Sequence, residues 1–110
     1  MIVTFKSAAA GDVIMFGDVA RRMMELMGKD ATDQGIVTVE QLPDAVARLR
    51  AAIDADKARS AGRSEDELPH SETGEDGRRR PYVSLAQRAA PLLELLEWAK
   101  RKGKPVTWGV

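Results

Sequence analysis

The amino-acid sequence predicts an α+β fold in which a small sheet of two or three strands, formed by the two ends of the chain, is covered by three helices. Three observations support this class. Both ends alternate apolar with polar residues as half-buried strands do, and three internal segments repeat apolar residues at helical spacing. The 110-residue chain also has the length of a single domain, residues 1–110, which would bury about two-thirds of its unfolded surface.

Residues 1–6 and 105–110 are expected to be strands because β-branched and aromatic residues alternate with other types there. An isolated strand leaves its backbone groups without partners, so we expect these two segments to pair with each other. A short apolar run at 36–38 would add a third, minimal strand. The residues expected on the helix-covered face of the terminal strands are Val3, Phe5, Val106, Trp108 and Val110.

The first helix is expected to follow Gly11, with Asp12 as its N-cap, and to end at Gly28. Gly17 would lie inside this helix, where glycine costs about 1 kcal/mol relative to alanine. We therefore expect either a close approach by another backbone at Gly17 or a less regular start to the helix. The apolar residues at helical spacing are Val13, Phe16, Ala20, Met23, Met24 and Met27.

The second helix has two candidate starting points. Thr38–Gln41 matches a capping box, whereas Pro43 favours a start at Leu42 because proline suits the first helical turn. The apolar stripe of this helix is Val39, Leu42, Val46, Leu49 and Ile53.

The third helix is expected to begin after Ser84, because Ser84–Gln87 is a second capping box. Pro91 lacks a backbone N–H, so it should kink this helix or split it. Gly103 ends the helix, and the basic residues 100–102 complement the negative end of its dipole. The apolar face consists of Leu85, Ala89, Leu92, Leu96 and Ala99, widened by Leu93 and Leu95.

Charge is distributed unevenly along the chain. Residues 59–81 contain eleven charged residues among 23 and almost nothing to bury, so we expect a disordered linker there. The net charge is zero, yet residues 1–77 carry nine basic and fifteen acidic residues, whereas residues 78–110 carry eight basic and two acidic ones. We expect the basic part to dock on the acidic part or to complement helix dipoles.

The composition excludes several classes of protein. With no Cys, the chain has no disulfide framework, thiolate nucleophile or thiolate metal site. No apolar run approaches the roughly 20 residues that cross a bilayer, and Ile2–Phe5 is too short for a signal-peptide core. We therefore expect a cytoplasmic protein without membrane contact.

No combination of residues predicts catalysis, a metal site or a cofactor. His70 lies in the polar linker, where nothing would fix the orientation of its ring. Residues 30–41 are spaced like a calcium loop, but Thr32, Gln34 and Gln41 stand where such a loop needs carboxylates. Phosphate-binding glycine loops and G-x-S-x-G nucleophile motifs are absent.

Arg78, Arg79, Arg80 and Trp108 are the candidate partner-binding residues. The arginines could contact phosphates, but a chain without excess positive charge favours solvated or internally paired arginines, so nucleic acid is disfavoured as a partner. Trp108 is expected to be a core anchor, with an interface anchor as the alternative. Trp98 is also expected in the core, as are Met15, Met23, Met24 and Met27, for which an adaptable binding groove is the alternative.

Five segments resemble a family of short bacterial proteins catalogued only as a domain of unknown function: residues 1–7, 15–20, 39–43, 85–89 and 105–110. The resemblance spans nearly the whole chain and implies a variable charged linker between the second and third helices. The family supplies no substrate, cofactor or active site, so no functional residue is carried over to this sequence.

Three functions remain open. The leading hypothesis is a non-enzymatic interaction or regulatory domain, binding an unknown protein or a second copy of itself, because a small sheet leaves edges that a partner strand can extend. The first alternative is a nucleic-acid accessory protein that uses the basic residues 78–110. The second is an enzyme with an unrecognised site that acts through carboxylates and arginines, for which an unexpected ligand in a pocket lined by Asp18, Arg21 or Arg22 would be the sign.

Overall fold

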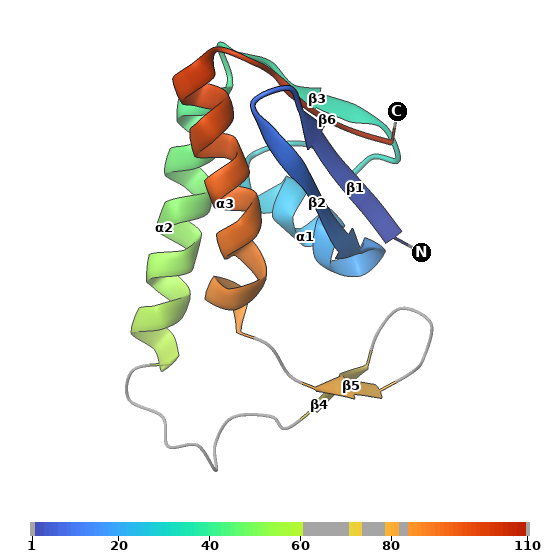
Figure 1. Cartoon of the computed structure of the whole chain (residues 1–110). Helices are drawn as coiled ribbons and strands as arrows, with labels where there is room; N and C mark the ends of the chain where they lie inside the picture. The colour runs from blue at the N-terminus through green and yellow to red at the C-terminus, as the bar shows by residue number, and fades with distance from the viewer. Residues whose placement is uncertain (1, 61–70, 74–78, 82–83, 110) are drawn as a thin grey trace.

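The computed structural model describes residues 2–60, 71–73, 79–81 and 84–109 (Figure 1). Its helices and strands confirm the predicted α+β class, with both ends of the chain in one sheet. In chain order the elements are β1 (Ile2–Ser7), β2 (Ala10–Phe16), α1 (Gly17–Leu26), β3 (Gly35–Val37), α2 (Leu42–Ser60), β4 (Ser71–Thr73), β5 (Arg79–Pro81), α3 (Leu85–Lys102) and β6 (Val106–Trp108).

The main sheet is antiparallel and has the strand order β2-β1-β6-β3. Phe5 of β1 lies opposite Trp108 of β6, which confirms that the two terminal strands pair. The minimal strand near residue 36 is also confirmed, since β3 pairs with β6 and forms one edge of the sheet. The other edge is β2, which was not predicted.

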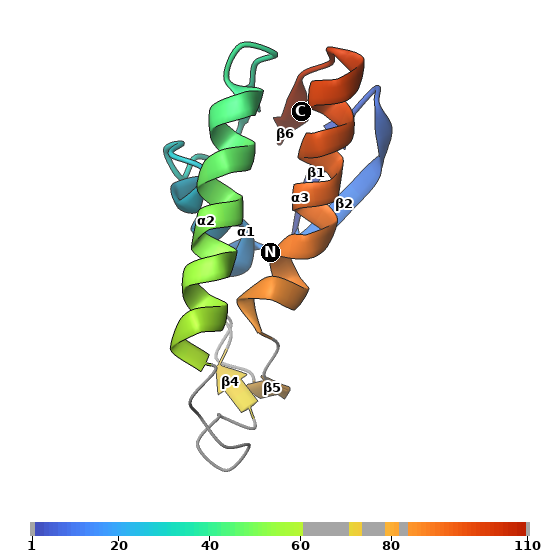
Figure 2. The ribbon, with the colours of Figure 1, turned by 90° about the vertical axis from the view of Figure 1, so that its left-hand side faces the viewer.

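One face of this sheet packs against the helices and forms one side of the hydrophobic core. Val3, Phe5, Val106 and Trp108 are buried, as the alternation predicted, and the rings of Phe5 and Trp108 lie 5.8 Å apart. All three helices contribute buried residues to the same core. Helices α2 and α3 lie side by side along one side of the sheet (Figures 1 and 2). The helices therefore cover one sheet face, as expected.

The prediction of a helix from Asp12 was wrong over its first turns. Residues 10–16 form β2, which pairs with β1, and the helix begins only at Gly17. The turn between the strands is Ala8–Ala9, where the Ser7 hydroxyl accepts a hydrogen bond from Ala9 N–H at 3.1 Å. Since Gly17 starts the helix, the cost of an interior glycine does not arise. The end of the helix agrees with the prediction, because Gly28 has a φ of +82°.

The second and third helices begin and end close to the predicted residues. Helix α2 starts at Leu42, and the Gln41 side chain accepts from Thr38 N–H at 3.1 Å, so half of the predicted capping box forms. Both halves form at Ser84 and Gln87 before α3. Gly103 caps α3 in the left-handed conformation. Pro91 does not split the helix, which runs without a break from Leu85 to Lys102.

The charged segment 59–81 differs in part from the expectation of a linker without secondary structure. Helix α2 continues to Ser60, and the short strands β4 and β5 pair with each other. The remaining residues of the segment, 61–70 and 74–78, lie outside the described part of the chain, as does His70.

Candidate protein-interaction surface

Three large apolar side chains remain exposed where β1 and β2 pair. Ile2 is 63% exposed, Ile14 65% and Phe16 49%, although their neighbours Val3 and Met15 are buried. Ile2 and Phe16 lie opposite each other where β1 pairs with β2, and Ile14 lies two residues before Phe16 on β2. The three residues are therefore neighbours on the same face of the sheet. We call these three residues the apolar edge. Water-exposed apolar side chains gathered in this way are typical of a binding surface.

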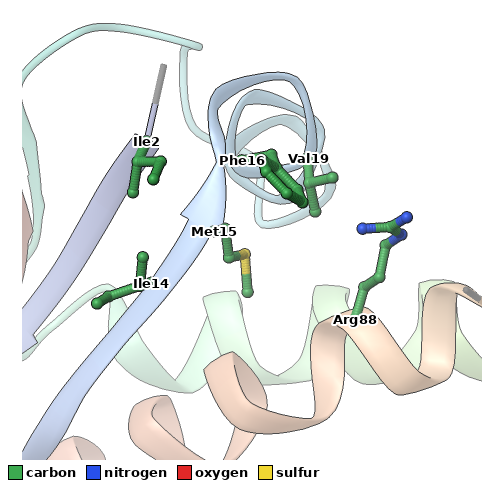
Figure 3. Close-up of a pocket in the computed structure, with 6 residues that line it drawn as sticks. All are labelled: Ile2, Ile14, Met15, Phe16, Val19 and Arg88. Carbon is green, nitrogen blue, oxygen red and sulfur yellow. The ribbon is translucent and has the colours of Figure 1, made fainter. Parts of the chain in front are cut away.

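The apolar edge lines a hollow of about 270 Å³ that also reaches α1 and α3 (Figure 3). Met15 of β2, Val19 of α1 and Arg88 of α3 complete its described lining. The Arg88 side chain points from α3 toward Val19 and Phe16 (Figure 3). The hollow is therefore mainly apolar, with one cationic group at its side, which is the usual character of a site that binds an apolar group.

A second hollow, of about 230 Å³, lies farther along β2. It is formed between the first half of β2 and the middle of α3. Its lining residues are Ala10, Gly11, Val13, Pro91, Glu94, Leu95 and Trp98. The two hollows thus follow the outer side of β2 from one end to the other, with α3 as their common wall.

The basic end of α3 contacts the β1–β2 turn and a tryptophan of the same helix. Lys102 Nζ donates a hydrogen bond to the carbonyl of Ala9 at 3.1 Å, which fastens α3 to the β1–β2 turn. Arg101 and Lys102 also lie 4.9 and 5.3 Å from the centre of the Trp98 ring. Trp98 is 39% exposed, so its expected place in the core was wrong. The end of α3 therefore presents an exposed aromatic ring beside two cationic side chains.

Of the four residues singled out as partner-binding from the sequence, Trp108 does not line this surface. Trp108 is 1% exposed and its indole N–H donates to the carbonyl of Thr32 at 3.0 Å, so its role as a core anchor is confirmed. A side chain so deeply buried offers no surface to a partner. Arg79 and Arg80 belong to β5, opposite Thr73 and Glu72, and Arg78 lies outside the described residues.

The apolar edge does not follow from the sequence, because the predicted first helix includes residues 12–16, which form part of β2. Phe16 is expected among the apolar residues of the first helix, whereas it lies in β2 and about half of its surface is exposed. The continuous apolar run at residues 13–16 was the available signal, because such a run fits a strand as well as a helix. The methionines were assigned correctly, since Met15, Met23, Met24 and Met27 are all buried.

Residues 30–41, which were compared with a calcium loop, are held by amide and hydroxyl groups. The Gln41 side chain, at the position of the terminal ligand, accepts from Lys29 Nζ at 3.0 Å. Thr32 donates its hydroxyl proton to the carbonyl of Gln34 at 2.8 Å. Within the described residues no three His, Cys, Asp or Glu side chains are grouped so that they could hold a metal ion.

Comparison with models of known protein families gives a match. A family model with the description "Domain of unknown function (DUF1840)" matches residues 1–108. Searches of curated proteins and of solved structures gave no significant match. In the part of the chain that the structure describes, no helix has both the length and the apolar character needed to span a membrane.

Proposed function

Since the chain belongs to the DUF1840 family, a domain of unknown function, we propose from its surface that it is a non-enzymatic protein-interaction domain that binds its partner along β2. The observation that carries this proposal is the apolar edge, in which Ile2, Ile14 and Phe16 are each about half exposed or more. These three side chains share the sheet face opposite the buried Val3 and Met15, and two of them belong to the edge strand β2.

Burial of the apolar edge would supply binding energy. Fully burying an Ile or Phe side chain contributes about 1.5–3 kcal/mol, and roughly half of that is still available for side chains that are half exposed. Phe16 is suited to the role of anchor, because aromatic residues at the centre of an interface carry a large share of the affinity. The strand edge adds main-chain hydrogen bonds to this apolar contact.

The chemistry of the hollow favours binding over catalysis. Its described lining has one ionisable side chain, that of Arg88, and five apolar ones. Nucleophilic catalysis needs an activated nucleophile, and general acid–base catalysis needs a side chain that gains and loses a proton, which an arginine does not. As part of the same proposal we place the protein in the cytoplasm, which suits a chain without cysteine.

Photo-crosslinking tests the proposed surface. A benzophenone amino acid replaces Phe16 in the full chain inside cells, and the control carries it at Ala47, an exposed residue of α2. We expect a protein adduct, either with another protein or with the chain itself, after irradiation of the Phe16 variant and not of the Ala47 variant. Equal labelling at both positions, or none at either, contradicts the proposal.

Nucleic-acid binding is the second candidate because the exposed Trp98 ring lies beside two cations. Proteins that bind single strands combine stacking aromatic residues with basic side chains. The negative end of the α3 dipole and the bond from Lys102 to Ala9 account for part of this charge without a ligand. Salt-dependent gel retardation of single-stranded DNA or RNA, lost in Trp98→Ala, would support this alternative, and no retardation at low salt would exclude it.

A further inference from the structure

We propose that the partner bound along β2 is a second copy of this chain, whose own β2 pairs antiparallel with the first about a two-fold axis at Ile14. The inference rests on the proposed function, because it names the partner of the same surface. The two four-stranded sheets would become one continuous sheet of eight strands, with α3 of each copy beside α3 of the other.

The edge formed by β2 is open and suited to pairing. The strand has seven residues, whereas the opposite edge, β3, has three. Among the described strands, β2 pairs only with β1, so its other edge has no strand partner. Proteins usually protect such an edge with lysine, proline or a bulge. In β2 such devices are confined to the first half of the strand, which contains Asp12 and the irregularity between Ala10 and Val13, whereas residues 13–16 carry no charge and no proline.

The side chains of β2 select the register of this pairing. In a two-fold antiparallel pair each residue lies opposite its mirror position, and facing side chains interact directly. An axis at Asp12 would place two carboxylates against each other. An axis at Ile14 instead places Ile14 opposite Ile14, and Val13 opposite Met15. Apolar residues then meet apolar residues across the centre of the interface.

The charges along α3 fit the same axis. Helix α3 runs antiparallel to β2, because Arg88 borders the hollow at Met15 and Phe16, whereas Glu94 borders the hollow at Gly11 and Val13. A two-fold axis at Ile14 exchanges these two ends. Arg88 of each copy, a half-buried side chain that also interacts within its own copy, would then approach Glu94 of the other copy, so the symmetry forms the contact twice. Opposite charges that meet across an interface favour this pairing over other registers.

A second copy fits these features better than an unrelated strand. In the two-fold pair, the apolar residues 13–15 of one copy contact the same residues of the other. Arg88 and Glu94 of the same surface supply the two opposite charges. A contact that is its own complement about a two-fold axis closes after two copies, which is the commonest symmetry of soluble oligomers. Both β2 edges are then covered, so pairing through β2 stops at two copies.

Cysteine cross-linking tests the register in the full chain, which has no cysteine of its own. Directly opposed residues in an antiparallel pair have Cα atoms about 4.5–5.5 Å apart, within the range that a disulfide spans. We expect Ile14→Cys to form a disulfide dimer under mild oxidation at micromolar concentration. The matched control is Ile36→Cys, an exposed isoleucine on β3, which should remain uncross-linked. Equal cross-linking of both variants, or of neither, would overturn the inference.

Light scattering of the unmodified chain provides an independent measurement. We expect twice the mass of the chain at micromolar concentration, and Ile14→Lys should raise the dimer dissociation constant about 30-fold or more, because it places two cations at the axis. Arg88→Glu and Glu94→Arg should each weaken the dimer, and the double variant should recover it. Circular dichroism confirms that each variant is folded.

The outcomes separate this inference from the proposed function. If the chain is monomeric and Phe16 cross-links to a different protein, the interaction function stands and self-association is wrong. If the chain is monomeric and Phe16 cross-links to no protein, both are wrong. A dimer in which Ile36→Cys cross-links and Ile14→Cys does not would place the interface elsewhere and overturn the proposed axis.

Discussion

Gly35 and Trp108 lie directly opposite each other in the β3–β6 ladder, and the indole occupies the space where a side chain of residue 35 would lie. A Cβ atom at residue 35 would be 2.2 Å from Cζ2 of Trp108, far inside van der Waals contact. The indole cannot move aside easily, because it is 1% exposed and its N–H is bonded to the carbonyl of Thr32. The absence of a side chain at Gly35 thus allows the last strand to bury its tryptophan.

Gly35→Ala is therefore expected to destabilise the fold. The added methyl group must displace a packed ring, and overpacking of this kind typically costs about 1–3 kcal/mol. Urea denaturation followed by tryptophan fluorescence measures the change in the free energy of unfolding. Gly11→Ala is the matched control, since a Cβ atom there meets no atom within 4 Å. A loss at Gly35 no larger than at Gly11 would contradict the packing argument.

The contact between α2 and α3 should depend on packing rather than on its ion pair. Arg50 of α2 and Glu97 of α3 form a salt bridge, but the two side chains are 56% and 35% exposed. Exposed ion pairs contribute roughly 0–1 kcal/mol, whereas Leu→Ala in a core costs about 2–5 kcal/mol. We expect Glu97→Gln to lower the free energy of unfolding by less than about 1 kcal/mol, an effect that salt reduces.

Leu96→Ala provides the comparison, because Leu96 is fully buried on the same helix. It should cost at least twice as much as Glu97→Gln, and salt should leave its effect unchanged. Denaturation curves at low and high salt separate the two contributions. If Glu97→Gln were the more damaging change, the helices would be held together mainly by charge.

Several elements could be predicted from the sequence because their signals are local. The capping box at Ser84 and Gln87, and the glycine after Lys102, specify the two ends of α3 through bonds within a few residues. Alternation in the terminal strands places Val3, Phe5, Val106 and Trp108 on one face, and the structure buries all four. The pairing of β1 with β6 followed from the need of each strand for a partner.

The part that could not be predicted depends on contacts distant in sequence or on unusual turn residues. The apolar run at residues 13–16 is compatible with a helix or a strand, and its pairing with β1 decides the outcome. The connecting turn is Ala8–Ala9, which lacks the Asn-Gly or Asp-Gly signature of a two-residue hairpin. Because β2 was not predicted as a strand, the apolar edge beside it could not be predicted either.

Helix α3 offers a test of its N-terminal cap. The Ser84 hydroxyl accepts a hydrogen bond from Gln87 N–H at 3.2 Å, and the Gln87 side chain accepts from Ser84 N–H at 3.3 Å. Ser84→Ala removes the first of these bonds and should lower the free energy of unfolding by about 1 kcal/mol. Ser84→Thr keeps a hydroxyl acceptor and should lose clearly less. Equal losses in chemical denaturation would mean that the hydroxyl does not cap the helix.

At the other end of α3, the backbone conformation of Gly103 can be tested apart from packing. Its φ is +67°, in the left-handed region, yet a Cβ atom there would meet no atom within 4 Å. Gly103→Ala should therefore lower the free energy of unfolding by about 1–2 kcal/mol through backbone strain alone. Gly103→Asn should lose less, because asparagine enters this conformation more readily. A ranking of Gly, Asn and Ala by thermal unfolding checks this, and an Ala variant as stable as the natural chain would show that α3 can end without a left-handed residue.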